Sequence, residues 1–428
     1  MIVKRTLVLS GGGTKGIYQA GVIEALQQLG ENHFDKVIGV SVGSLNAAML
    51  VQKDFAKLLE MYSHLSADQI VNGFVPTDMS LKNIINEREE FVPALQYYIK
   101  EHGIDIRPFY DFVHSYYDEK KFFASEIDFG CVVATKKDHS GVFVTKEMMR
   151  DHGEDWLIAS CSAYPAFPVK DVDGNEYVDG GYYDNCPIDY ALRDGADEIV
   201  AIEMGEQTLH PLYENASMIH LIHPHYPLYD FLCFDQEKMQ KAKILGYNDA
   251  MKYYKKYCGY RYTFYRFPFP SYFQEYQKAL LLLENDVKNA TPLNERRRSE
   301  HIISDKLSEK MHVSQLHEKL YYFGMLDTLM EMCNMADEKV YTIDEAKNTI
   351  LANFAKAAYE DYPYKPSFVP AELVSYIASL DKKTIVMLLL HALFYPSHEL
   401  IGESLRYTVY PFECALAQFL YIMMKHLI

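Results

Sequence analysis

Two glycine-flanked turns near the start of the chain decide the fold: Ser10-Gly11-Gly12-Gly13-Thr14-Lys15-Gly16 and Gly39-Val40-Ser41-Val42-Gly43. A short apolar run at residues 6–9 precedes the first turn, and a β-branched run at 36–40 leads into the second. Apolar residues recur at helical spacing after each turn. The sequence therefore predicts two successive strand–turn–helix units, with Ser41 at the corner of the second.

Ser41 stands in a Gly-x-Ser-x-Gly pattern between Gly39 and Gly43. Such a corner holds the serine in a strained conformation with its hydroxyl exposed, and the glycines let neighbouring backbone pass close by. The helix that follows adds the positive end of its dipole. Ser41 is therefore a candidate nucleophile.

A nucleophilic serine needs a base and donors for the oxyanion that forms after attack. Glycines 11–13 at a helix N-terminus can turn backbone N–H groups toward an anion, so we expect Gly11, Gly12 and Gly13 to form an oxyanion hole. Asp179 ends a very short predicted strand, and Gly180 and Gly181 clear space for it to reach Ser41. As the direct base, Asp179 would need a shielded site that raises its basicity. Taken alone, Asp-Gly-Gly would be a plain turn.

Two other functions remain open. Residues 11–16 also satisfy the G-x-G-x-x-G pattern of a dinucleotide-binding loop, with Asp35 near the spacing of a ribose-binding acid. Asp35, however, precedes the second predicted strand, whereas the acid belongs at its far end, where Ser41 lies. The order Ser41, Asp179 and then His223 or His225 fits a Ser-His-Asp hydrolase, although that nucleophile normally follows several strands.

The chain of 428 residues is longer than one hydrophobic core usually holds. Strands that alternate with helices predict a mostly parallel sheet covered on both faces, an α/β fold. From about residue 235 the pattern becomes helical, so we expect a catalytic domain at 1–230 and a mainly helical region at 231–428. Further strands are predicted at 128–135, 141–145, 198–202 and 218–223, and a compact helix at 151–162. Long helices are predicted at 235–257, 274–288, 295–334 and 343–359, followed by two apolar helices at the C-terminus.

Composition excludes several classes of function. The formal net charge of −17 argues against a nucleic-acid binder, which needs a basic face. The seven cysteines are scattered and form no C-x-x-C pair, so neither a zinc site nor a disulfide framework is expected. No apolar run reaches the roughly 18 residues of a spanning helix, and residues 6–9 are too short for a signal-peptide core. We expect a cytoplasmic protein, and peripheral association with membranes is the alternative location.

Four blocks of sequence together resemble the patatin-like phospholipase family, in the same order along the chain. They are residues 10–16, 39–47, 160–168 and 177–188. The resemblance covers about residues 6–222. A weaker resemblance is present at 245–250, and the helical C-terminal region is not covered.

The resemblance implies a three-layer α/β/α catalytic domain and a Ser41–Asp179 dyad without histidine. It also implies an acyl-Ser41 intermediate, an oxyanion hole at residues 11–13, and Thr14, Lys15 and Gly16 as supporting motif residues. The implied substrates are acyl esters of phospholipids, lysophospholipids or acylglycerols at a lipid or membrane surface, with no cofactor and no metal. The C-terminal helices could serve as a lid, a membrane-docking surface or the interface of a homo-oligomer.

Overall fold

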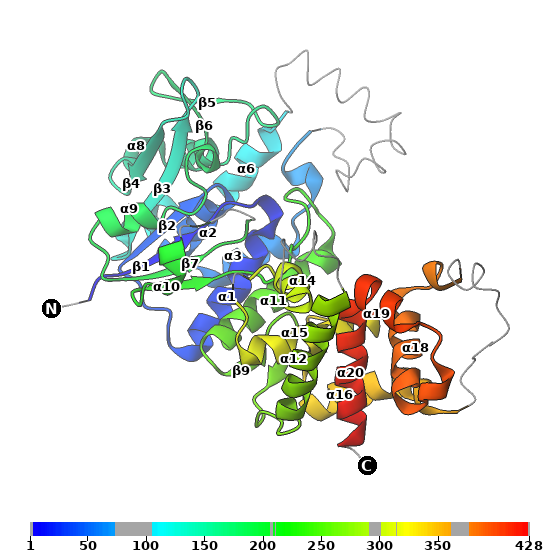
Figure 1. The fold of residues 1–428 in the computed structure, drawn as a ribbon. Coiled ribbons are helices and arrows are strands. Elements are labelled where there is room, and N and C mark those ends of the chain that lie inside the picture. The colour runs from blue at the N-terminus through cyan, green and yellow to red at the C-terminus, as the bar shows by residue number, and fades with distance from the viewer. Residues whose placement is uncertain are drawn as a thin grey trace. The chain divides into compact units, whose positions relative to one another are not determined.

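A computed structural model of the chain describes residues 3–72, 105–205, 209, 211–290, 301–313, 315–360 and 376–426 (Figure 1). The chain divides into two compact units, Met1–Lys255 and Lys256–Ile428. This division lies later than the expected boundary after residue 230, and helix α11 (Gln236–Tyr253) accounts for the difference. α11 packs along helix α1 (Gly16–Leu29) of the first unit.

Glycines allow α1 and α11 to approach at backbone distance. A Cβ atom at Gly246 would overlap the carbonyl oxygen of Tyr18, and one at Gly21 would overlap that of Lys243. The Tyr18 hydroxyl also donates to Asp249 Oδ2 at 2.8 Å, inside the first unit. Residues 245–250 therefore belong to the first unit, and Gly246 and Asp249 are buried in it.

An eight-stranded sheet forms the centre of the first unit, in the order β5-β6-β3-β2-β1-β7-β8, with β4 paired to β3. β1, β2, β3, β7 and β8 pair in parallel, whereas β4, β5 and β6 pair antiparallel. The predicted mostly parallel sheet is thus confirmed. The strands are β1 (Arg5–Leu9), β2 (Lys36–Val40), β3 (Asp128–Thr135), β4 (Gly141–Thr145), β5 (Lys170–Val172), β6 (Asn175–Asp179), β7 (Glu198–Ile202) and β8 (Ile219–Ile222).

Helices cover both faces of this sheet, which makes the unit a three-layer α/β/α fold (Figure 1). Successive strand residues point to opposite faces. Val8 and Ile38 pack in one core cluster with Ile188 of α9 (Ile188–Arg193). Leu7 and Val37 point to the other face, toward α1 and α2 (Val42–Val51). The remaining helices are α3 (Phe55–Ser63), α6 (Arg107–Tyr116), α7 (Glu119–Ala124), α8 (Met149–Ser160) and α10 (Pro211–Asn215).

The second unit is mainly helical and also contains a three-stranded sheet, β11-β10-β9, which the sequence did not predict. The predicted helix at 295–334 is two helices, because His312 adopts a left-handed conformation (φ 53°) that ends the first; residues 295–300 lie outside the described part. The elements are β9 (Tyr257–Gly259), β10 (Thr263–Tyr265), α12 (Phe273–Ala290), α14 (Ile302–Met311), α15 (Glu318–Met332), β11 (Val340–Tyr341), α16 (Ile343–Phe354), α18 (Lys382–Phe394), α19 (Glu403–Val409) and α20 (Pro411–Lys425).

Aromatic side chains fill the core of the second unit. Tyr322 is fully buried and contacts the rings of Phe273 and Phe419. Packing therefore accounts for much of the tyrosine and phenylalanine content of this region. Across the described parts of both units, no helix is long and apolar enough to cross a bilayer.

Candidate active site

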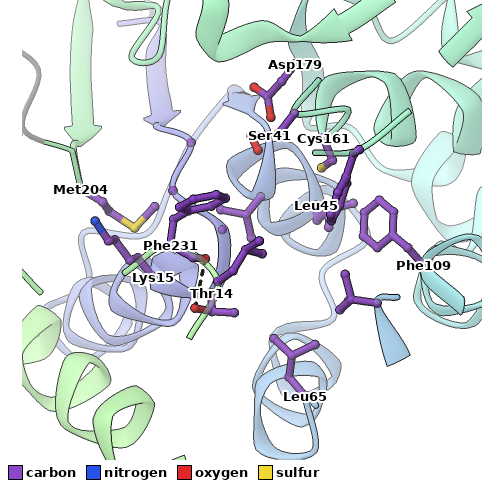
Figure 2. A pocket seen from close by; sticks show the side chains of 18 of the residues that line it. Thr14, Lys15, Ser41, Leu45, Leu65, Phe109, Cys161, Asp179, Met204 and Phe231 are labelled. Atoms are coloured by element: carbon purple, nitrogen blue, oxygen red, sulfur yellow. Dashed lines mark hydrogen bonds between the residues drawn. The ribbon is translucent and has the colours of Figure 1, made fainter. Parts of the chain in front are cut away.

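β2 and β6 meet end to end on one edge of β3, and this arrangement brings Ser41 and Asp179 together. On β3, Val132 pairs with Val40 of β2, and the next residue, Val133, pairs with Asp179 of β6. Val132 and Val133 both pair with β4 as well. Because a strand has two edges, β2 and β6 must share the edge opposite β4. Ser41, which follows Val40, therefore lies beside Asp179 (Figure 2).

Ser41 occupies the strained corner that its sequence predicts. Its backbone has φ 52° and ψ −130°, a conformation that is costly for a residue with a side chain. Its carbonyl oxygen accepts from the Ser44 N–H at 2.8 Å and from the Ser44 hydroxyl at 2.6 Å. A Cβ at Gly39 would overlap the carbonyl of Gly43, and one at Gly43 would overlap the carbonyl oxygen of Leu9, so neither flanking position has room for a side chain.

Asp179 is 7% exposed and faces the hydroxyl of Ser41 (Figure 2). One carboxylate oxygen accepts from the Gly181 N–H at 2.7 Å. Burial raises the pKa of Asp179 to about 6, although the Gly181 N–H and the Ser41 hydroxyl both act to lower it. A Cβ at Gly180 would overlap the Val132 carbonyl oxygen, so this glycine lets the chain turn directly against β3.

The glycine loop, residues 11–13, lines the cavity next to Ser41, and its N–H groups differ in their partners. The Gly11 N–H donates to the Asn185 carbonyl at 3.2 Å, and Thr14 donates to the Phe231 carbonyl from its N–H at 2.8 Å and from its hydroxyl at 3.2 Å (Figure 2). In the described part of the chain, the N–H groups of Gly12 and Gly13 donate to no protein acceptor. Of the three predicted oxyanion donors, Gly11 thus differs from the other two, because its N–H already has a protein acceptor.

Lys15 lines the same cavity and lies beside Met204, with both side chains near Gly12 (Figure 2). It also acts on the buried carboxyl of Glu203. Burial raises the pKa of Glu203 to about 7, against the opposing effects of the Gly205 N–H and the Lys15 charge. Lys15 is thus next to the glycine loop and partly balanced by a protein carboxylate.

The cavity that joins these residues has a volume of about 250 Å³. Ser41, Asp179, Gly11–Gly13, Thr14 and Lys15 all line it. Most of its wall is apolar and comes from α2, α3, the turn after α3, α6 and the loop that precedes α11 (Figure 2): Leu45, Met61, Leu65, Phe109, Phe112 and Phe231. Such a wall suits a hydrocarbon chain next to the hydroxyl of Ser41.

A buried polar network, which the sequence analysis missed, ties the glycine loop to α2. The Asn46 side-chain amide donates to the Gly16 carbonyl at 3.1 Å and to Gln19 Oε1 at 2.8 Å. Asn46 Oδ1 accepts from the Tyr62 hydroxyl at 2.9 Å, and Gln19 Nε2 donates to the Ser10 carbonyl at 2.8 Å. Asn46 lies in the 39–47 block, but no local pattern identifies its distant partners.

Asn46→Leu is expected to lower the free energy of unfolding of the first unit by about 2–5 kcal/mol, because several buried polar groups lose their partner. Trp156 in α8 is the chain's one tryptophan and is buried, so its fluorescence during urea unfolding reports on this unit. Asn215→Leu, at an exposed helix end, is the matched control and should stay within about 0.5 kcal/mol of wild type. Equal stability of the two variants would contradict a structural role of the network.

The histidine and the ribose-binding acid that the two alternative functions require do not line this cavity. His223 follows β8, which β7 and β1 separate from β2, and no histidine among the described residues lines the cavity. Asp35 lies at the start of β2, the end opposite Ser41, where its carboxylate accepts from the Arg5 N–H at 2.7 Å. No group of three or more His, Cys, Asp or Glu side chains in the described residues is placed to hold a metal ion.

Comparison with known proteins finds similarity over the part of the chain that contains Ser41 and Asp179. Residues 7–192 match the family model of the patatin-like phospholipases. The cUMP-AMP-activated phospholipase of Escherichia coli is 27% identical over 212 residues, which is 44% of this chain and 58% of that protein. Lysophospholipase nte1 of Aspergillus niger is 27% identical over 204 residues, 46% of this chain and 12% of that protein. The match thus spans less than two thirds of either relative.

Among solved structures, VipD from Legionella pneumophila aligns with 97% of this chain and 91% of its own. The TM-score is 0.39 and the sequence identity is 12%.

Proposed function

We propose that this protein, whose residues 7–192 match the family model of the patatin-like phospholipases, is a serine hydrolase that cleaves acyl esters of lipids. The observation that carries this proposal is the position of Ser41 and Asp179 at the meeting point of β2 and β6, within one apolar cavity. The proposed substrates are phospholipids, lysophospholipids or acylglycerols at a lipid surface, with the acyl chain against the apolar wall.

In the proposed reaction, Asp179 takes the hydroxyl proton of Ser41 as Ser41 Oγ attacks the acyl carbonyl carbon. The tetrahedral intermediate expels the alcohol, which leaves with the proton from Asp179, and the acyl group stays on Ser41. Water then attacks the acyl-Ser41 ester while Asp179 accepts its proton. The fatty acid leaves, and the proton returns to the Ser41 oxygen.

The oxyanion of both tetrahedral intermediates is proposed to bind the N–H groups of Gly12 and Gly13. These donors have no protein acceptor among the described residues, whereas the Gly11 N–H donates to the Asn185 carbonyl. Preorganised donors in an apolar site stabilise developing charge strongly, because no solvent has to reorient. The role of Gly11 is then to fix the loop rather than to bind the oxyanion.

The buried position of Asp179 suits a carboxylate that acts as a base without histidine. With a pKa of about 6, Asp179 is ionised at neutral pH and is more basic than an ordinary aspartate. Activity requires the ionised form. We therefore expect kcat/KM to rise with pH, to reach half its maximum near pH 6 and to level off above about pH 7.

A soluble short-chain ester, assayed from pH 4.5 to pH 8 at constant ionic strength, measures this profile. An activity that does not fall between pH 7 and pH 4.5 would contradict a base whose pKa burial has raised.

The test of the proposed function is covalent labelling with a fluorophosphonate, which reacts with activated serines. The purified protein is treated, digested and mapped by mass spectrometry, with Asp179→Asn and a heat-denatured sample as controls. We expect an adduct on Ser41 in the native wild-type protein alone. No adduct on Ser41 in the folded wild-type protein would overturn the proposal.

A further inference from the structure

Ser160, the last residue of α8, contacts the candidate nucleophile directly. It is fully buried, and its hydroxyl donates to the Val132 carbonyl of β3 at 2.8 Å. The same hydroxyl oxygen accepts from the Ser41 N–H at 3.0 Å. One side chain thus joins the end of a helix, the central strand and the backbone of Ser41.

This contact completes the restraint on the backbone of Ser41. A serine with φ near 52° stores strain of about 1–3 kcal/mol and keeps that conformation only where its surroundings hold it. Ser44 holds the carbonyl side of Ser41 through two hydrogen bonds. Ser160 holds the N–H side, so neither backbone polar group of Ser41 is free to rotate.

Val132, whose carbonyl oxygen accepts from Ser160, lies on β3 next to both candidate catalytic residues. Val132 pairs with Val40, directly before Ser41, and its neighbour Val133 pairs with Asp179. Gly180 also lies against the Val132 carbonyl, the oxygen to which Ser160 donates. Ser160 therefore binds the segment of β3 that sets the position of Ser41 relative to Asp179.

The contact also limits which groups can bind an oxyanion. Because the Ser41 N–H donates to Ser160, it is not available to the tetrahedral intermediate. We propose that Ser160 is a positioning residue: its hydroxyl holds Ser41 in the reactive conformation and leaves the oxyanion to the glycine loop. This inference rests on the proposed function, since it concerns how the same site reaches its reactive geometry.

Ser160→Ala is the direct test, because alanine keeps the helix and removes the hydroxyl. Without its acceptor, the Ser41 N–H can rotate and Ser41 Oγ loses its fixed distance to Asp179. We expect kcat for a soluble ester to fall by about 10- to 100-fold while KM changes by less than about 3-fold. The rate constant of fluorophosphonate labelling at Ser41 should fall by the same factor as kcat/KM.

Ser162→Ala is the matched control. Ser162 is also fully buried, and its hydroxyl donates to the Ile158 carbonyl at 2.9 Å, within the same helix end. Both variants lose one buried hydroxyl and should destabilise the first unit, as Trp156 fluorescence would report. The loss should be larger in Ser160→Ala, which breaks two hydrogen bonds, than in Ser162→Ala, which breaks one. Only Ser160→Ala should lose kcat. Ser160→Cys, which fills the same space with a weaker acceptor, should also lose kcat and serves if the alanine variant does not fold.

The outcomes separate this inference from the proposed function. A folded Ser160→Ala or Ser160→Cys variant with wild-type kcat would overturn the positioning role alone. An equal loss of kcat in Ser162→Ala would overturn it too, because the loss would then belong to the helix end in general. If the wild-type protein shows neither turnover nor labelling at Ser41, both the proposed function and this inference are overturned.

Discussion

Ser41→Ala is expected to lower kcat/KM for ester hydrolysis by at least about 10⁴-fold, because the variant lacks the Oγ that attacks the ester and carries the acyl group. The remaining activity would come from substrate binding and the glycine loop. Alanine fills less space than serine at the same backbone position, so the fold should persist. Initial rates with a soluble ester and with a phospholipid dispersion measure the effect.

Circular dichroism and Trp156 fluorescence serve as the folding controls for Ser41→Ala. Turnover within about 10-fold of wild type by the folded variant would place the nucleophile elsewhere.

Asp179→Asn is expected to lower kcat by about 10³- to 10⁵-fold. The amide oxygen of asparagine can still accept from the Gly181 N–H, which Asp179 binds at 2.7 Å, so the local geometry should be kept. An amide cannot take the Ser41 proton, and that loss accounts for the effect. Fluorophosphonate labelling of Ser41 should slow in parallel with kcat.

The same substitution should stabilise the protein, and the sign follows from the raised pKa. The folded state binds the Asp179 proton more tightly than the unfolded chain does, because burial disfavours the charged carboxylate. Wild type therefore loses stability relative to Asp179→Asn as pH rises from about 4 to about 6, and the difference stays constant above that range. A shift from 3.8 to about 6 corresponds to up to about 3 kcal/mol.

Urea unfolding at pH 4 and pH 8, followed by Trp156 fluorescence, measures this difference in stability. A wild-type protein more stable than Asp179→Asn at pH 8 would contradict a destabilised buried carboxylate at this position.

Histidine variants complete the test of Asp179 as the base. His223→Gln and His225→Gln should keep kcat within about 3-fold of wild type, since no histidine in the described residues lines the cavity. Retained activity in Asp179→Asn together with its loss in either histidine variant would instead establish a Ser-His-Asp hydrolase. Tight NAD binding without esterase activity would support the dinucleotide-binding alternative.

Local sequence patterns predicted most elements of the first unit. The residues of β2, β3 and β4 are those predicted, and Ser41 lies at the predicted strand-to-helix corner with positive φ. These features depend on neighbours within a few residues: apolar alternation, turn residues and glycines that permit close backbone contact. The helical C-terminal region was predicted less well, because its three-stranded sheet joins short strands far apart in the sequence.

The sequence by itself thus determined the α/β class, the strand-to-helix corner at Ser41 and the short strand that ends at Asp179. Only the tertiary structure decided that β2 and β6 share one edge of β3. It also decided that the Gly11 N–H donates to the Asn185 carbonyl and that the Ser41 N–H donates to the Ser160 hydroxyl. The physical reason is that strand register and buried hydrogen bonds join residues distant in sequence. No local propensity specifies such partners, and they are set when the whole core packs.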